Sequence, residues 1–266
     1  MRNAFLLCLG PALVFGTPAL ASSSAWHASE GGQVRLVTSG APDKSGHLQG
    51  ALEIQLKPGW KTYWRDPGSS GVPPQLDVSA STNIASWDMA FPAPQRHDDG
   101  YGPWAGYDRS VVLPIAFTLT DPGRKTPIEA TVFLGMCETI CIPVQARLSV
   151  DPASGADDAA DARTVQAGKA ALPADATADF GVTPLPGDDK TLVVEAHLPG
   201  DATAAEFFIA GSDDYIFGTP HRKDRDGKVV FSIPILDRPA SRPAGNGLHY
   251  TLTGPAGAVS GLLPYP

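Results

Sequence analysis

The sequence predicts an all-β protein made of two immunoglobulin-like β-sandwich domains joined by an Ala- and Asp-rich linker. The apolar residues come in short runs bounded by Gly, Pro or Asp, and 28 Gly and 26 Pro are available to end them. Helical periodicity is nearly absent. All five Trp lie before residue 105, whereas residues 151–178 contain no aromatic residue. Short strands with frequent turns are typical of antiparallel sandwiches, and the change in composition indicates two of them.

The first 21 residues have the character of a secretory signal peptide. Arg2 precedes an apolar stretch (4–15), and an Ala-x-Ala step ends at Ala21. The apolar stretch is shorter than the ~20 residues that a membrane span requires. We therefore expect cleavage after Ala21, loss of Cys8 with the peptide, and a periplasmic protein that does not insert into the membrane.

The charge balance excludes one class of partner. The chain has 20 Lys and Arg against 28 Asp and Glu, a net charge of −8. Nucleic-acid binding requires a basic face, and none is visible. No phosphate-binding glycine loop, Ser-His-Asp order or His-Glu-x-x-His motif is present either, so we expect no cofactor.

The first predicted domain covers residues 22–150. Its apolar runs, which we expect to be strands, are 33–40, 50–59, 110–123, 128–137 and 141–152.

Cys137 and Cys141 lie at the facing ends of the last two runs. If residues 138–140 form a three-residue hairpin loop, the cysteines are directly opposite each other, with Cα atoms ~4.5–5.5 Å apart, which a disulfide accepts. The period of two places Met136 on the apolar face and Cys137 on the other. We therefore expect both sulfurs to point away from the core and to be open to a second thiol.

The pair has three possible roles: a structural bridge, a metal clip or a redox pair. Closing so short a loop removes only ~2 kcal/mol of unfolded-state entropy, against nearly ~5 kcal/mol for a long loop. A redox pair needs only proximity and access. The residues favour the redox role and leave the other two open.

The predicted linker spans residues 151–178 and includes a candidate helix over 159–171. The second β-sandwich domain is predicted over 179–266, with a hairpin signal at Asp226-Gly227. Its apolar runs are 191–200, 205–211, 228–236, 248–255 and 258–264. We expect this domain to support or extend a partner surface.

Three stretches and the spacing between them resemble a known family: "GWKTYWRDPGSSGVPPQLDV" (59–78), "FPAPQRHDDGYGPWAGYDRSVVLPIAF" (91–117) and "VFLGMCETICIPVQARLSV" (132–150). They are similar to the amino-terminal periplasmic domain of the DsbD thiol:disulfide interchange reductases. The ScsB-type (suppressor of copper sensitivity) relatives are more similar, because they share the C-x3-C spacing. The resemblance is strong over residues 30–150 and loose over the second domain.

The resemblance implies an immunoglobulin-like domain whose cysteine pair receives electrons from a membrane-embedded partner and passes them to oxidised periplasmic proteins. In the family, a membrane core and a thioredoxin-like domain normally follow, but this sequence ends at Pro266 without them. We therefore expect the donor to be a membrane-embedded thiol reductase of the DsbD/CcdA type on another chain. The acceptor is expected to be a thioredoxin-like exported protein. By analogy, Cys141 reacts first and Cys137 resolves the mixed disulfide.

The family also shields its disulfide with a cap loop, which resembles residues 98–102 here. Gly100 stands where DsbD has an aromatic shield. We expect Tyr101 or Trp104 to take over this role.

Further residues are candidates for the surroundings of the pair. Tyr63 and Trp64 are expected to line it, with a place in the sandwich core as the alternative for each. Asp98, Asp99 and Glu138 are expected to raise the pKa of the cysteines, because like charge disfavours the thiolate. As solvated loop carboxylates, they would have no such effect. His97 adjoins them and could be a metal ligand or a proton carrier, but a lone loop histidine is usually neither.

The leading functional hypothesis is a periplasmic thiol–disulfide relay with protein-disulfide reductase-like exchange. The alternative is a copper-binding or copper-tolerance module, in which Cys137, Cys141 and Met136 supply soft ligands for Cu(I), with His97 as a further ligand. A non-catalytic adhesion or assembly sandwich is the third reading.

Overall fold

The protein is described by a computed structural model, which covers residues 22–266 except 69–70, 99, 101, 155–157, 212–214, 242 and 244–246. The predicted signal segment (1–21), with Cys8, lies outside the described residues. Within them, strands dominate and α1 (Ala159–Ala170) is the one α-helix, which confirms the all-β prediction. No helix in these ranges is long and apolar enough to cross a membrane.

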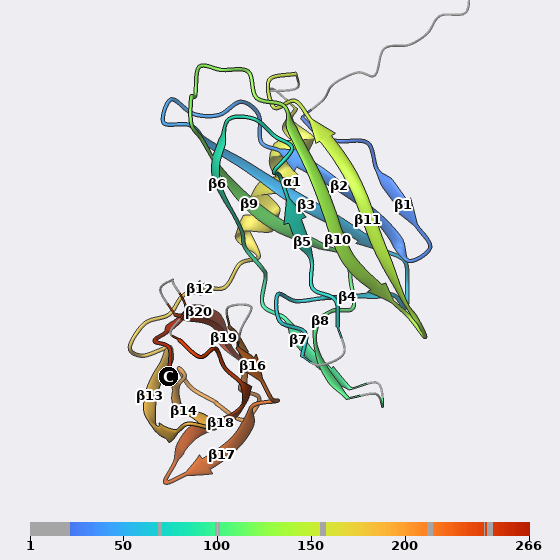
Figure 1. Ribbon diagram of the computed structural model, residues 1–266. Helices are drawn as coiled ribbons and strands as arrows, with labels where there is room; N and C mark the ends of the chain where they lie inside the picture. Colours follow the sequence, from blue (N-terminus) through green and yellow to red (C-terminus); the bar gives the residue numbers. More distant parts are fainter. Residues whose placement is uncertain are drawn as a thin grey trace, which may run out of the picture.

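The first half of the chain forms two antiparallel sheets that pack face to face (Figure 1). One sheet has the strand order β1-β2-β3-β9-β6, and the other has the order β11-β10-β4-β8-β7, with β5 paired to β10. The strands are β1 (His27–Ser29), β2 (Gly32–Thr38), β3 (His47–Leu56), β4 (Lys61–Tyr63), β5 (Gln75–Asp77), β6 (Ile84–Met89), β7 (Gln95–Asp98), β8 (Pro103–Tyr107), β9 (Val111–Leu119), β10 (Ile128–Cys137) and β11 (Cys141–Val150).

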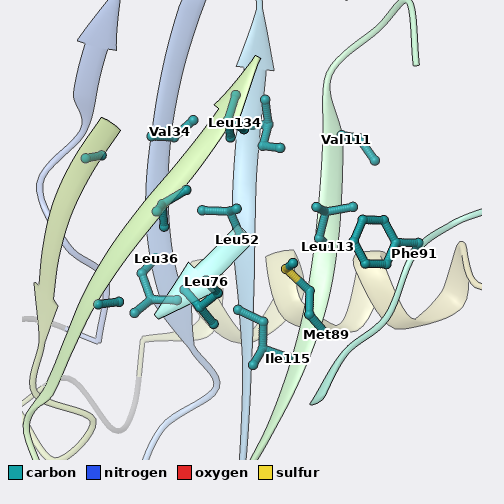
Figure 2. Close-up of a cluster of buried hydrophobic side chains, with 14 of the residues drawn as sticks. Val34, Leu36, Leu52, Leu76, Met89, Phe91, Val111, Leu113, Ile115 and Leu134 are labelled. Carbon is teal, nitrogen blue, oxygen red and sulfur yellow. The ribbon is translucent and has the colours of Figure 1, made fainter. Parts of the chain in front are cut away.

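Alternation along these strands builds the first core. Leu36 and Leu52 from one sheet face Leu134 from the other, and all three are fully buried (Figure 2). Their neighbours in sequence point outward, as the period of two requires. The predicted runs at 128–137 and 141–152 therefore coincide with β10 and β11 almost to the residue.

Helix α1 lies within the predicted linker and packs on the first sheet. Asp158 caps it by accepting hydrogen bonds from the N–H groups of Ala160 and Asp161. Its Val165 packs against Val37 and Ala51 on the outer face of β2 and β3. This part of the linker is thus a docked helix and not an extended tether.

The second half of the chain forms two further sheets. Their strand orders are β12-β20-β19-β15 and β13-β14-β18-β16, with β17 paired to β18. Only β12 and β20 pair in parallel among the described strands. The strands are β12 (Ala174–Asp175), β13 (Gly181–Asp188), β14 (Thr191–His197), β15 (Glu206–Ala210), β16 (Ile216–Phe217), β17 (His221–Arg225), β18 (Lys228–Asp237), β19 (Leu248–Gly254) and β20 (Gly257–Leu263).

A second buried cluster fills the space between these two sheets, with Phe207, Phe231 and Leu252 among its members. Phe208, the next residue along β15, points the other way and joins the first core. The domain boundaries that we assigned at 22–150, 151–178 and 179–266 stay predictions.

Candidate functional site

The two cysteines form a disulfide at the loop end of the β10–β11 hairpin. Cys137 and Cys141 are direct cross-strand partners, their Cα atoms are 4.0 Å apart, and their sulfurs are bonded. The loop between them is closed by a hydrogen bond from the N–H of Glu138 to the carbonyl of Ile140, at 3.1 Å. The predicted three-residue loop and cross-strand pairing are present.

The two cysteines differ in their exposure to solvent. Cys137 lies on the face of β10 opposite Met136, as the alternation predicts, but its exposed fraction is only 1%. Tyr63 and Trp104 cover it in a small cluster that is separate from the main core. Cys141, on the neighbouring strand, is exposed. The expectation that both sulfurs are open to attack is therefore wrong for Cys137, because side chains from distant strands lie over it.

Tyr63 contacts both sulfurs through its hydroxyl group. It ends β4, which pairs with the end of β10, and its Oη lies 3.1 Å from Sγ of Cys137 and 3.3 Å from Sγ of Cys141. Burial raises the pKa of the Tyr63 hydroxyl. The phenol therefore keeps its proton at neutral pH and can donate it in a hydrogen bond to a thiolate.

Trp104 forms the next layer of the cover. Its ring meets Tyr63 edge-on, with centroids 5.7 Å apart, and it stacks on His97 at 4.2 Å. Nζ of Lys61 lies 4.6 Å from the centroid of the same ring. Trp104 thus lies beside Cys137, and its role as the shield stays a prediction.

Lys61 and His97 also belong to this layer around Trp104, which we did not predict. Burial lowers the pKa of Lys61 and is the main cause of the lowered pKa of His97. Lys61 precedes Tyr63 by two residues on β4, so the period of two was the signal that placed it on the same face. His97 lies directly across the ladder from Trp104, a relation that sequence alone does not reveal.

The candidate acidic residues lie at the rim. Glu138 is exposed in the hairpin loop, and Asp98 is exposed at the end of β7, where its carboxylate accepts a hydrogen bond from the N–H of Gly100 at 2.9 Å. Asp99 and Tyr101 lie outside the described residues. Gly100 has a positive φ of 86°, a conformation that favours glycine. The influence of these carboxylates on the cysteine pKa stays a prediction.

The structure does not bring Trp64 to the disulfide. Tyr63 and Trp64 are consecutive, so they point to opposite sides: Trp64 is 2% exposed, belongs to the main core and meets Phe208 edge-on at 6.0 Å. The alternative that we considered for Trp64, a buried sandwich aromatic, fits its position.

Met136 is also away from the sulfurs. It is fully buried in the main core, and its sulfur accepts a hydrogen bond from Oγ of Ser29 at 3.3 Å. A Cu(I) site that combines Met136 with Cys137 and Cys141 is therefore wrong, because β10 turns Met136 to the opposite face. Among the described residues, no group of three or more His, Cys, Asp and Glu side chains is arranged to hold a metal ion.

The chain is similar to known proteins over part of its sequence and in its fold. Residues 33–152 match the family model of the N-terminal domain of thiol:disulfide interchange protein DsbD. None of the curated proteins compared with the chain is similar enough to count as a match. The fold is similar to the crystal structure of the N-terminal periplasmic domain of ScsB from Proteus mirabilis, with a TM-score of 0.72 and 21% identity over 90% of this chain and 96% of that one. Residues 33–152 are therefore similar to the DsbD amino-terminal domains, and the fold of the chain is similar to that of the ScsB domain.

Proposed function

We propose that this protein is a periplasmic thiol–disulfide relay, which takes electrons from a membrane-embedded thiol reductase and passes them to a thioredoxin-like exported protein. The observation that carries the proposal is the asymmetric disulfide: Cys141 is exposed, whereas Cys137 is buried and lies beside the Tyr63 hydroxyl. Exchange needs one sulfur that a partner can reach and one that can leave as a stabilised thiolate.

The proposed half-reaction begins with attack on Cys141. A thiolate of the reduced donor attacks Sγ of Cys141, the bond to Cys137 breaks, and Cys137 leaves as a thiolate. The Tyr63 hydroxyl, 3.1 Å from that sulfur, donates a hydrogen bond to the developing charge. The second thiol of the donor then attacks the mixed disulfide. It releases Cys141, so two electrons and two protons have moved to the Cys137/Cys141 pair and the donor has become a disulfide.

The second half-reaction runs the same steps in reverse. The exposed thiolate of Cys141 attacks the disulfide of the oxidised acceptor, and Cys137 resolves the mixed disulfide. The acceptor is released with two thiols, and the protein returns to the disulfide form.

Trapping experiments test the proposal. A Cys137→Ser variant keeps the accessible sulfur and is expected to accumulate mixed disulfides with its partner, whereas the matched Cys141→Ser variant keeps only the buried sulfur and is expected to accumulate few. A reduction potential above about −300 mV is expected for the native pair, since inert structural bridges lie below that value. A lower potential, with no mixed disulfide from Cys137→Ser, would indicate a structural bridge.

No observation favours the copper alternative, since the described residues leave only the two sulfurs as soft ligands near each other. Titration of Cu(I) into the reduced protein tests it directly. An affinity no higher than that of the Cys137→Ser, Cys141→Ser double variant would remove it.

A further inference from the structure

The β7–β8 hairpin touches both the disulfide and the second half of the chain. His97 on β7 and Trp104 on β8 are cross-strand partners, and their stacked rings form the outer layer over Cys137. Arg96 and Ala105 are the adjacent pair of partners in the same ladder. Because neighbouring residues of a strand point to opposite faces, this second pair lies on the side away from the disulfide.

Arg96 fastens that second face to β15. Its Nη2 donates a hydrogen bond of 2.9 Å to the carbonyl of Phe207, and its guanidinium lies 4.7 Å from the centroid of the Phe208 ring. Phe208 is 1% exposed and also packs edge-on against Trp64. The guanidinium is therefore held by a charge-assisted hydrogen bond and a cation–π contact at once.

A cleft of about 280 Å³ opens beside Arg96 and is lined by Trp64, Pro103, Ala105 and Phe208, among other residues. Burial lowers the pKa of Arg96, while the nearby charge of Glu206 raises it. Removing the guanidinium leaves the carbonyl of Phe207 without this donor and also removes the contact with the Phe208 ring, so both of these interactions between the hairpin and β15 are lost together.

We propose that Arg96 is a positioning residue for the exchange reaction: by tying the β7–β8 hairpin to β15, it keeps Trp104 over Cys137 and leaves Cys141 as the entry point. The inference rests on the proposed function and deepens it. In this proposal, β15 in the second half of the chain holds Trp104 in place over the buried sulfur of Cys137. Arg96 touches neither sulfur and acts through Trp104.

Alkylation of the buried thiol tests this inference without any partner protein. In the full chain with Cys141→Ser, Cys137 is the only thiol among the residues that the structure describes. Its rate of reaction with iodoacetamide reports how often Trp104 and Tyr63 move away from it. Arg96→Met keeps most of the side-chain length but loses the charge and the donor. We expect it to raise the rate about tenfold, which corresponds to ~1.4 kcal/mol. Arg96→Lys, which keeps the cation, is expected to restore part of the protection.

A matched control is available in the second half of the chain. Arg222 donates to the carbonyls of Ala202 and Thr203 at 2.6 and 2.7 Å but does not touch the hairpin. Arg222→Met is expected to leave the alkylation rate unchanged. Should Arg96→Met fail to fold, Phe208→Leu removes the ring beneath the guanidinium and is expected to raise the rate in the same direction.

A double-mutant cycle separates positioning from general stability. Trp104→Leu alone is expected to raise the alkylation rate, and adding Arg96→Met to it is expected to raise the rate no further, because both changes remove the same cover. The inference is overturned if Arg96→Met leaves the rate within twofold of the parent, or if its effect multiplies with that of Trp104→Leu. The proposed function fails separately, if the unmodified pair does not exchange with a reduced thioredoxin.

Discussion

At the scale of single residues, Tyr63 is placed to influence the chemistry of the sulfurs. Its hydroxyl lies within hydrogen-bond distance of both, and no other polar side-chain contact to Cys137 is recorded among the described residues. Because burial raises the pKa of the Tyr63 hydroxyl, it remains a donor across the pH range in which thiols ionise. A hydrogen bond from this neutral donor favours the charged form of the buried sulfur.

We expect Tyr63→Phe to slow exchange by about tenfold, because a hydrogen bond to a charged group is worth ~1.5–3 kcal/mol and only part of that charge has developed in the transition state. The pKa of the Cys137 thiol should rise in the same variant, since the lost donor favoured the thiolate. Stopped-flow exchange with dithiothreitol and thiolate absorbance against pH would measure both.

Tyr107→Phe is the matched control for that substitution. It also removes a buried hydroxyl, which donates to the carbonyl of Pro92 at 2.8 Å, but that hydroxyl does not contact the sulfurs. Equal exchange rates for Tyr63→Phe and the native protein would contradict a role for the phenol in stabilising the thiolate.

The strand period predicted some of these residues and not others. Alternation along one strand is a local property, so the face of Cys137 and the disulfide across the hairpin followed from the sequence. The burial of Cys137 did not, because its contact with Tyr63 spans 74 residues of sequence. The same limit explains Trp64: Tyr63 and Trp64 both suited the site by residue type, but consecutive residues at the end of β4 point to opposite sides, so only one of them can face the site.

At the scale of elements, the β10–β11 hairpin carries an apolar tip. Ile140, in the loop next to Cys141, is 68% exposed. An isoleucine so exposed beside the accessible sulfur gives a partner an apolar contact of its own. The loop therefore has a surface suited to docking as well as to chemistry.

Ile140→Ser is expected to raise the KM for a protein partner by about fivefold to tenfold. Complete burial of an isoleucine side chain contributes ~1.5–3 kcal/mol, and a partner that docks on the loop is expected to bury only part of this side chain. The kcat and the free energy of unfolding should stay unchanged. Leu262→Ser, at a 46% exposed leucine on β20, is a control that should leave KM unaltered. A fall in kcat without a change in KM would argue against docking.

Helix α1 is the second element with a testable role. Asp161 is 3% exposed; it accepts a hydrogen bond from Oγ of Ser22 at 2.6 Å and lies 3.5 Å from Nη1 of Arg35. The composition of residues 151–178 predicted the helix but not this docking, because Ser22 and Arg35 are more than a hundred residues away in sequence. The partners of a buried carboxylate are a tertiary property.

Asp161→Ala is expected to lower the free energy of unfolding by about 2–4 kcal/mol, since it leaves the buried Ser22 hydroxyl and part of the Arg35 guanidinium without an acceptor. Urea unfolding would measure this loss. Asp158→Ala, at the exposed N-cap of the same helix, should cost less. A loss no larger than that of Asp158→Ala would mean that the buried contacts do not hold the helix in place.

At the scale of the whole molecule, the cores of the two halves meet at consecutive aromatic residues of β15, Phe207 and Phe208. Phe207 lies in the second core, whereas Phe208 lies in the first, so β15 contributes consecutive side chains to both. The sequence predicted the all-β class because turn residues and alternation are local signals. It did not predict that Phe207 and Phe208 would join different cores, because this depends on how sheets that are far apart in the chain pack together.

The stability of the molecule should fall at alkaline pH. Burial strongly raises the pKa of Tyr107, with the nearby Arg65 opposing the shift. The unfolded chain releases this proton near pH 10, whereas the folded protein retains it to higher pH. The unfolded state therefore binds fewer protons above about pH 10, and the free energy of unfolding should drop by up to ~1.4 kcal/mol per pH unit for this group.

Chemical denaturation between pH 8 and pH 11 would check the alkaline prediction. Tyr107→Phe should lower stability at neutral pH through the lost hydrogen bond but should show a shallower alkaline slope. An identical slope in the variant would assign the effect to other groups.

The short span of the disulfide also links oxidation to folding through a closed thermodynamic cycle. Cys137 and Cys141 are separated by only 4 positions, so the bridge stabilises the folded state by no more than ~2 kcal/mol. By the cycle, folding stabilises the bridge by the same amount, which corresponds to about 40 mV. The fold therefore leaves the driving force of the pair close to that of the free hairpin peptide. Its larger influence is on which sulfur a partner can reach, and so on the rate and selectivity of each turn of the redox cycle.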